Sequence, residues 1–223
     1  MSSTNRGGKR IDGDWYSTPA WTTRAILPHL NVWRSTRMRV LDPCAGKGAI
    51  LDVVRADWPD AIRLGFEIDQ ERATVARVGC ADALLEPWPG ADVVLTNPPF
   101  SLAMEFVTRS AEQCPKADRA FLLRLAFLAS QERAAFHKAN PCDLFVLGRR
   151  PSFAASLKCA KNAKHNGCGW QVLQELDAPR PKTCPSCGLC GLTVTTSDSA
   201  DYAWMIFGPG RGGRWSILET EAA

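Results

Sequence analysis

Short apolar runs alternate with amphipathic segments along residues 39–147, and this alternation limits the folds open to the chain. Strands are predicted where the runs are short and apolar, at residues 39–41, 62–68, 93–95, 120–125 and 144–147. Helices are predicted between them, at residues 49–56, 70–78, 102–110 and 130–138. This rhythm is typical of an α/β fold whose mostly parallel sheet has helices on both faces.

The rhythm stops after residue 153 and returns for one apolar strand predicted at residues 202–207. The segment between has no sustained period of either kind and is rich in cysteine, proline and basic residues, so it is interpreted as an inserted module. Four parts are therefore expected: a flexible basic leader at 1–14, a core at 15–153 plus 197–208, an insertion at 154–196, and a flexible tail at 209–223.

The 9 cysteines are not expected to form a disulfide framework. The first ten residues are polar and basic with no apolar h-region, which predicts a reducing, cytoplasmic compartment. The longest apolar run, residues 121–129, is interrupted by Arg124 and is shorter than the ~20 residues of a membrane span. Buried thiols and metal ligands are the remaining interpretations of the cysteines. A net charge of +4 permits a nucleic-acid partner without arguing for one.

A glycine turn follows the first predicted strand and opens the next helix, with the sequence Asp42-Pro-Cys44-Ala-Gly46-Lys-Gly48. Small residues let the backbone approach a ligand, and the helix N-terminus presents free N–H groups. Such a turn alone is weak evidence, because it also occurs as a tight turn without a ligand.

Two acids at later strand ends strengthen the interpretation. Glu67 ends the next strand, 21 residues after Gly46, where a carboxylate can accept both hydroxyl hydrogens of a ribose. Asp82 follows the next helix, where a third strand end would reach an adenine amino group. Each acid alone is equally explained as a solvated strand-end carboxylate, but together they favour a nucleoside-shaped ligand. The absence of Gly-x-Gly-x-x-Gly and Gly-Lys-Ser/Thr disfavours dinucleotide and triphosphate sites.

A stiff turn, Asn97-Pro98-Pro99-Phe100, follows the strand predicted at residues 93–95. Two prolines fix φ and push Asn97 into an extended conformation. The Asn97 side-chain oxygen and the Pro98 carbonyl can then accept from one –NH₂ group, while Phe100 offers a flat face to the planar molecule that carries it. Holding both hydrogens makes the lone pair of an aromatic amine available to a sulfonium methyl. The alternative is a purely structural Pro-Pro turn.

These residues resemble the S-adenosylmethionine-dependent amino-methyltransferases, which methylate adenine N6 or cytosine N4 in DNA on a Rossmann-like sheet. The resemblance covers about residues 15–153 and 198–207. It implies cofactor-binding roles along the chain and a catalytic role for the proline turn. The implied cofactor-binding residues are Tyr16, Thr18, Pro19, Asp42, Cys44, Gly46, Gly48, Glu67, Asp82 and Asn97. The implied catalytic residues are Asn97, Pro98, Pro99 and Phe100.

The order of the motifs is similar to the gamma type, and two later segments look like the closing motifs of small phage-type adenine methyltransferases. These are Arg149–Phe153 and Asp198–Trp204, which are usually close in sequence but here are separated by the cysteine-rich insertion. Cys44 and Lys47 are tolerated variations of the glycine motif, with no catalytic role assigned. The resemblance implies adenine N6 as the target and the cytoplasm of a bacterium or phage-infected cell as the location.

The insertion has the ligand spacing of a zinc ribbon: His165-x2-Cys168-x15-Cys184-x2-Cys187. Bound Zn²⁺ would supply folding energy that a polar segment of ~40 residues lacks. Cys159 could replace His165, and Cys190 is a further candidate. The insertion could grip phosphates beside the active site or act only as a structural staple.

The function predicted first is site-specific DNA (adenine-N6) methylation with S-adenosylmethionine, on a base flipped out of the duplex. Methylation of a protein glutamine or an RNA base is the enzymatic alternative, because an amide or another base fits the same turn. A zinc-ribbon nucleic-acid-binding protein with a vestigial cofactor pocket is the non-enzymatic one. No membrane partner is expected, and the target sequence and oligomeric state are not predicted.

Overall fold

The computed structural model describes residues 17–31, 37–159, 171–175, 181–188, 192–195 and 200–219. It divides the chain into two compact units. The larger, called the core unit below, comprises Thr18–Pro151 and Ser199–Ala223. The other includes Ser152–Asp198. The expected basic leader, residues 1–14, lies outside the described residues.

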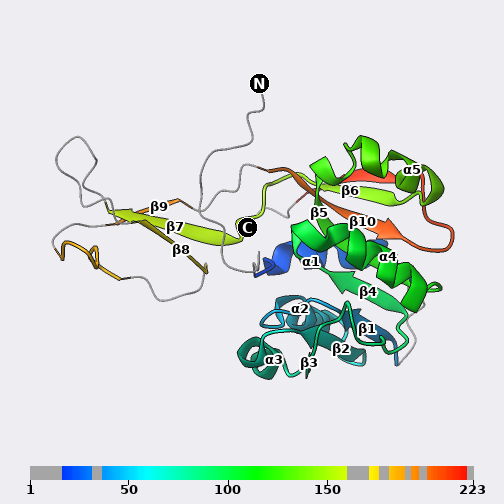
Figure 1. Ribbon diagram of the computed structural model, residues 1–223, viewed down its shortest axis with the longest axis horizontal. Coiled ribbons are helices and arrows are strands. Elements are labelled where there is room, and N and C mark those ends of the chain that lie inside the picture. Colours follow the sequence, from blue (N-terminus) through cyan, green and yellow to red (C-terminus); the bar gives the residue numbers. More distant parts are fainter. Residues whose placement is uncertain are drawn as a thin grey trace. The chain divides into compact units, whose positions relative to one another are not determined.

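The core unit is built on one sheet whose order is β11-β6-β10-β5-β4-β1-β2-β3 (Figure 1). Its strands are β1 (Arg39–Asp42), β2 (Ile62–Glu67), β3 (Gly79–Cys80), β4 (Val93–Thr96), β5 (Asp118–Arg124), β6 (Asp143–Leu147), β10 (Tyr202–Phe207) and β11 (Trp215–Leu218). All pairings are parallel except those of β10, which runs antiparallel to both β5 and β6. The predicted mostly parallel sheet is confirmed.

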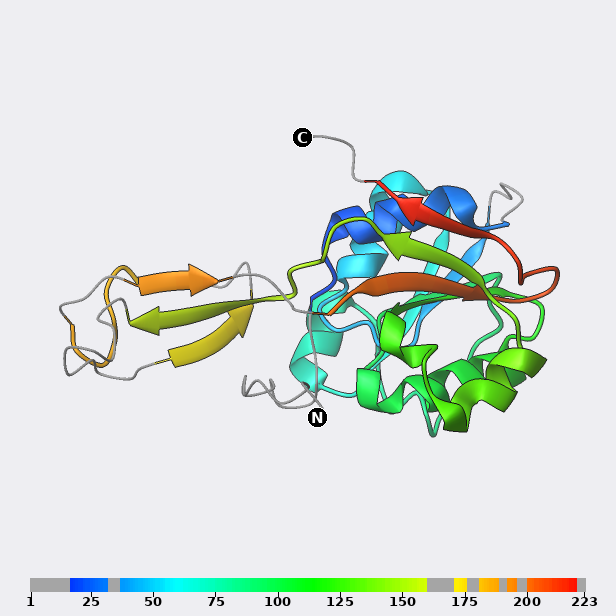
Figure 2. The ribbon, with the colours of Figure 1, turned by 90° about the horizontal axis from the view of Figure 1, so that it is seen from above.

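Helices cover both faces of this sheet, as the alternation predicts. They are α1 (Ala20–Ile26), α2 (Ala49–Asp57), α3 (Gln70–Ala76), α4 (Ala103–Gln113) and α5 (Gln131–Ala139), with short 3₁₀ turns at Leu27–His29, Phe100–Leu102 and Leu125–Phe127. Figure 2 shows α1 and α2 on one face and α4 and α5 on the other. None of the helices in the described part of the chain has the length and apolarity that crossing a bilayer requires.

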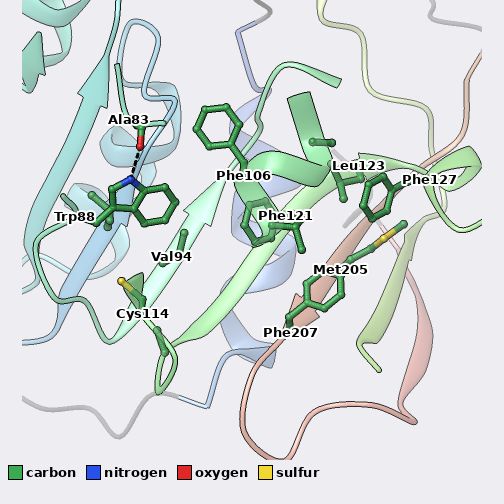
Figure 3. Close-up of a cluster of buried hydrophobic side chains, with 14 residues drawn as sticks. Ala83, Trp88, Val94, Phe106, Cys114, Phe121, Leu123, Phe127, Met205 and Phe207 are labelled. Carbon is green, nitrogen blue, oxygen red and sulfur yellow. Dashed lines mark hydrogen bonds between the residues drawn. The ribbon is translucent and has the colours of Figure 1, made fainter. Parts of the chain in front are cut away.

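A cluster of buried side chains joins α4 to the central strands (Figure 3). Phe121 and Leu123 alternate along β5, and Met205 and Phe207 do so along β10, so all four point to the same face of the sheet. Trp88 lies at one end of this cluster, where its indole Nε1 donates a hydrogen bond to the Ala83 carbonyl at 2.6 Å. The central strands are thereby held against α4, and their ends become a fixed platform for the loops above them.

The second unit contains a three-stranded antiparallel sheet, in the order β8-β7-β9. Its strands are β7 (Ala154–Cys159), β8 (Gln171–Glu175) and β9 (Leu192–Thr195). The sequence predicts no regular structure here, so these strands are additional to the expectation. Among the described residues no group of three or more metal-ligating side chains is found, and the predicted ligands His165, Cys168 and the alternate Cys190 lie outside them. The side chain of the other alternate, Cys159, is also outside the description.

The segment from residue 209, for which the sequence predicts a flexible tail, instead contains the edge strand β11. Its anchor is Arg211, whose guanidinium is fully buried and pairs with Asp118 and Asp143 at the amino ends of β5 and β6. Nη1 of Arg211 also donates to the His29 carbonyl at 3.0 Å. A run of glycines around a buried ion pair carries no periodicity, which is why sequence patterns miss this strand.

Candidate functional site

The candidate site lies where the parallel strands end. The carboxyl ends of β1, β2, β3, β4 and β5 face the same edge of the sheet, and β10, being reversed, contributes its first residue there. The sequence-predicted residues Asp42, Glu67, Asp82 and Asn97 all lie in or directly after those strand ends. In open α/β sheets this edge holds the ligand crevice.

The glycine turn forms a tight loop between β1 and α2. Gly46 and Gly48 both have positive φ, 55° and 90°, which side-chain-bearing residues rarely adopt. A Cβ on Gly48 would also lie 3.2 Å from Ala76 of α3. The Ala45 amide donates to the Phe66 carbonyl at 2.9 Å, so the loop is tied to the end of β2. Both glycines are therefore required by the local backbone.

Glu67 is held directly against this loop. Its Oε2 accepts a hydrogen bond from the Gly46 amide at 2.9 Å, while Oε1 accepts from the Asp69 amide at 3.0 Å. Arg72 of α3 donates to the same Oε1 from Nε at 3.2 Å and from Nη2 at 3.0 Å. The Glu67 side chain is 7% exposed, and these hydrogen bonds fix the orientation of its carboxylate.

Backbone pairing brings Asp82 beside Glu67. The Ala81 amide donates to the Glu67 carbonyl at 3.0 Å, and Asp82 follows directly. Oδ1 of Asp82 accepts from the Leu84 amide at 2.9 Å, which caps the next turn. Ile68, which the sequence analysis did not single out, is 66% exposed beside Glu67. An apolar residue that stands between two acidic residues at a strand end is the sequence signal that could have identified Ile68.

Asp42 is buried at the end of β1 with one oxygen unpaired. Oδ1 accepts from Thr96 Oγ1 at 2.7 Å and from the Cys44 amide at 3.1 Å, whereas Oδ2 has no partner among the described residues. Burial raises the pKa of Asp42 to about 7, and the nearby charge of Glu67 adds to the rise against the hydrogen bonds that lower it. The carboxyl group is therefore suited to a cationic ligand that would stabilise its charge.

Cys44 is not equipped to be a nucleophile. Burial raises the pKa of its thiol well above the usual value, and the negative charges of Asp42, Glu67 and Asp82 raise it further. A thiol in these surroundings stays protonated at neutral pH.

The Asn97 turn is joined to the glycine turn through its neighbour Thr96. The Thr96 hydroxyl bonds Asp42, and in Asn97 the side-chain Nδ2 donates to Thr18 Oγ1 at 3.0 Å. The other amide atom, Oδ1, is buried without a partner in the described part of the chain. No cis peptide occurs among the described residues, so both prolines follow trans bonds. The turn thus presents one fixed, unused acceptor.

Phe100 begins the 3₁₀ turn that leads into α4 and is partly exposed. Its ring lies 5.5 Å from the Tyr202 ring, centroid to centroid, and the Arg124 guanidinium carbon lies 4.7 Å from its centroid. In the sequence, Arg124 stands out only as an interruption of an apolar run. A charged residue that ends an otherwise buried strand at the ligand-binding edge is the signal that could have identified it.

Of the other sequence-predicted residues, Thr18 is buried and reaches Asn97, and Pro19 caps α1 with its carbonyl accepting from the Thr22 amide. Tyr16 lies outside the described residues.

In the second unit, Cys184 and Cys187 lie in one turn, in which the Gly188 amide donates to the Cys184 carbonyl at 2.8 Å. Gly188 has φ 68°, the left-handed conformation in which such a turn often ends.

No family model matches the chain, and no curated protein matches it. A Listeria monocytogenes protein assigned to the class I S-adenosylmethionine-dependent methyltransferases is similar in structure, with 13% identity, 96% of this chain and 69% of that chain covered, and a TM-score of 0.62. A type I restriction-modification methyltransferase subunit from Streptococcus thermophilus is also similar, with 15% identity, 91% and 47% covered, and a TM-score of 0.56.

A third similar structure, from Pyrococcus horikoshii, is assigned as an RNA methyltransferase, with 13% identity, 95% of each chain covered and a TM-score of 0.52. The chain spans about half the length of the S. thermophilus subunit, 47%. At these identities the similarity shows the fold: the chain has the architecture of class I S-adenosylmethionine-dependent methyltransferases.

Proposed function

We propose that the protein transfers a methyl group from S-adenosylmethionine to the exocyclic amino group of a base in DNA, adenine N6. The observation that carries this proposal is the unpaired, buried Oδ1 of Asn97 on a proline-stiffened turn, joined through Thr96 to the acid-lined nucleoside crevice. A buried acceptor without a donor costs free energy in the folded protein, ~1–3 kcal/mol, and an amine ligand relieves that cost.

The cofactor residues follow from the chemistry of its parts. Glu67 accepts from the ribose hydroxyls, Asp82 from the adenine amino group, and Ile68 packs on the ring. The Gly46–Gly48 loop leaves room for the methionine end, and the unpaired Oδ2 of Asp42 faces its ammonium charge. Three acids around one crevice suit a ligand with two positive charges. Tyr16 and Pro19 complete this set by resemblance.

The reaction needs little from the protein beyond positioning. S-adenosylmethionine supplies an electrophilic methyl group on a sulfonium. Asn97 Oδ1 and the Pro98 carbonyl accept the two amine hydrogens, which favours a tetrahedral nitrogen with its lone pair directed at that methyl. Pro99 keeps the turn rigid, so the geometry is set before the substrate arrives. The proton lost after transfer leaves to solvent, and no strong base is required.

DNA is proposed as the substrate on three grounds. Phe100 offers a ring for stacking a flipped base, worth ~1–3 kcal/mol per base. The chain carries a net charge of +4. Finally, one of the structurally similar proteins is a restriction-modification methyltransferase subunit. Zinc binding in the second unit is proposed alongside, on Cys184, Cys187 and the predicted ligands His165 and Cys168.

Mass spectrometry of nucleosides from cells that express the protein tests this proposal. DNA from these cells is expected to gain N6-methyladenine, and DNA from cells that express Asn97→Ala is not. N4-methylcytosine instead would correct the base but keep the chemistry. A methyl group found only on RNA or on protein glutamine would reject DNA as the substrate, and no S-adenosylmethionine binding by calorimetry would reject the enzyme altogether.

A further inference from the structure

The edge strand β11 carries two exposed apolar side chains. It lies at one end of the core sheet, next to β6 (Figure 2, red). Trp215 is 72% exposed and Ile217 is 55% exposed, whereas Leu218 is 6% exposed. Because side chains alternate along a strand, Trp215 and Ile217 lie on one face of the sheet and Leu218 lies on the other. The two exposed side chains are called the β11 patch below.

The backbone of the β11 patch also points away from β6. The Leu144 amide of β6 donates to the Arg214 carbonyl at 2.9 Å. The Gly148 amide, just after β6, donates to the Leu218 carbonyl at 3.0 Å. Since backbone groups alternate between the two sides of a strand, the even-numbered residues of β11 face β6 and the odd-numbered residues face outward. In the described part of the chain, β6 is the only strand that pairs with β11.

This outward edge lacks the features that usually protect an edge strand. Proteins commonly place a charged residue, a proline or a bulge in such a strand to prevent pairing with another chain. The four residues of β11, Trp-Ser-Ile-Leu, include neither a charge nor a proline. The Ile217 carbonyl accepts a long hydrogen bond from the neighbouring Ser216 hydroxyl, 3.4 Å, which a strand partner can replace. The edge is therefore suited to pairing with another strand.

A second copy of β11 complements this edge. In an antiparallel arrangement about a two-fold axis at Ser216, Trp215 of each copy lies opposite Ile217 of the other. Both residues have outward-facing backbone groups, so each opposite pair exchanges two hydrogen bonds. An aromatic residue opposite a β-branched one is a favourable cross-strand pair, and the symmetry provides it twice. A shift of two residues would instead leave each Ile217 opposite Gly213 or each Trp215 opposite Glu219.

The charges at the two ends of β11 favour the same arrangement. Arg214, directly before the strand, pairs with Asp143, but its side chain is still 55% exposed. Glu219, directly after the strand, is exposed. Antiparallel pairing places the Arg214 end of one copy beside the Glu219 end of the other, so charges of opposite sign meet at both ends. A strand with the same sign at both ends would be repelled by its own copy.

We propose that β11 is a dimer interface, at which a second copy of this chain adds its own β11 antiparallel to the first and extends the core sheet across the two-fold axis. The inference goes beyond the proposed function and does not depend on methyl transfer. Because the strand is only four residues long, the interface is small, and the dimer is expected to dissociate in the micromolar range.

Sedimentation velocity of the full chain over a range of concentrations tests the interface. The wild-type protein is expected to pass from monomer to dimer as the concentration rises. Trp215→Ala is expected to raise the dissociation constant about tenfold or more, because each dimer loses two cross-strand pairs. Ile217→Pro should abolish the dimer, since it removes an outward-facing donor without breaking a hydrogen bond to β6. Leu85→Ala is the matched control: it truncates an apolar side chain outside β11 that is 78% exposed, and should leave the dimer unchanged.

A cross-linking measurement tests the register. Ser216 would lie opposite its own copy in a non-hydrogen-bonded pair, where the two Cα atoms are about 4.5 Å apart. This spacing allows a disulfide, so Ser216→Cys is expected to form a covalent dimer under mild oxidation. Peptide mass spectrometry locates the disulfide, and the wild-type chain with its native cysteines is the control. Adding Ile217→Pro to Ser216→Cys should prevent the cross-link.

Three results would overturn the inference. A wild-type chain that stays monomeric at all concentrations would show that a second copy does not occupy this edge. A dimer that Trp215→Ala and Ile217→Pro leave unchanged would place the interface elsewhere on the chain. A dimer without the Ser216→Cys cross-link would contradict the antiparallel register. Circular dichroism checks that each variant is folded; if Ile217→Pro is unfolded, Trp215→Ala and the cross-link decide.

Discussion

Nδ2 of Asn97 donates a hydrogen bond to Oγ1 of Thr18 at 3.0 Å, which joins two positions 79 residues apart. This bond decides which end of the amide is left without a partner among the described residues. Because the nitrogen is engaged by Thr18, the oxygen is left as the acceptor, and it is the oxygen that an amine requires. The segment before α1 therefore orients the turn after β4.

Replacing Asn97 by alanine is expected to lower kcat by about 100-fold or more, since an acceptor that acts on the reacting nitrogen is lost. S-adenosylmethionine affinity should change less than about threefold, because the nucleoside contacts are made by other residues. Single-turnover methyl transfer and calorimetry measure the two quantities. Asn140→Ala is the control, since its side chain only caps the end of α5. Retained turnover in Asn97→Ala would refute the proposed chemistry.

The buried carboxyl of Asp42 should make cofactor binding depend on pH. With its pKa raised to about 7 in the folded protein, Asp42 is largely protonated at pH 6 and charged at pH 8. A ligand with ammonium and sulfonium charges is favoured by the carboxylate, so its affinity should rise with pH and level off above 7. Calorimetry from pH 5.5 to 8.5 measures this.

The same shift has a consequence for stability. The folded state binds this proton more tightly than the unfolded chain, so the free energy of unfolding should fall as pH rises from about 4 through 7. Asp42→Asn should reduce the pH dependence of both the cofactor affinity and the free energy of unfolding. Asp52→Asn, at an exposed position of α2, should change neither pH dependence. An affinity for the cofactor that is the same at pH 6 and pH 8 would contradict the role given to Asp42.

In the proposed cofactor complex, Arg72 would compete with the ribose for Glu67. It donates two hydrogen bonds to Oε1, and a ribose diol needs acceptor capacity on the same carboxylate. Arg72→Ala is therefore expected to tighten S-adenosylhomocysteine binding about threefold to tenfold, the size of a partly exposed ion pair. Glu67→Gln should weaken it. Arg55→Ala, which removes an exposed ion pair with Asp52, serves as control. Weaker binding by Arg72→Ala would mean that Arg72 supports the ligand.

The buried Arg211 should be one of the larger single contributions to the stability of the core unit. Arg211→Met leaves Asp118 and Asp143 buried with fewer partners, which costs about 3–5 kcal/mol. Arg150→Ala breaks an exposed pair with Asp201 and should cost less than about 1 kcal/mol. Urea unfolding followed by circular dichroism measures both. Similar losses in the two variants would show that burial does not set the strength of these pairs.

The cysteine-rich unit should contain one zinc ion per chain, measured by plasma mass spectrometry on protein purified without chelators. Cys184→Ser and Cys187→Ser are expected to lose the metal, because each removes one thiolate of a four-ligand site. Cys114→Ser, at a buried position of the core unit, should keep it. Stoichiometric zinc in both Cys184→Ser and Cys187→Ser would show that this turn does not supply the zinc ligands.

The core sheet was predictable because its strands are short, apolar and regularly spaced. The prediction for β10 matches its observed bounds, residues 202–207, because six consecutive apolar residues leave little choice of element. The edge strands β3 and β11 were not predicted. The position of β11 depends on partners distant in sequence, such as Arg211 with Asp118, 93 residues apart, whereas β3 is only two residues long, Gly79–Cys80.

For the candidate site, spacing placed the acids and the proline turn at one edge of the sheet. The spacing could not supply the side-chain contacts that determine which atoms of these residues are already engaged by a neighbour. Nothing in the local sequence indicates that Thr18 takes the nitrogen of Asn97, that Arg72 occupies Glu67, or that Arg124 covers Phe100. Each is a long-range side-chain contact between elements that only the fold brings together.

The second unit is inserted in the sequence between β6 and β10, and Arg150 and Asp201, which both belong to the core unit, form an ion pair at 2.8 Å. Since β6 and β10 are neighbouring antiparallel strands, a bare hairpin could join them without altering any other connection. The connection between β6 and β10 is thus a place where inserted segments of different chemistry could be exchanged while the other connections of the core sheet stay as they are.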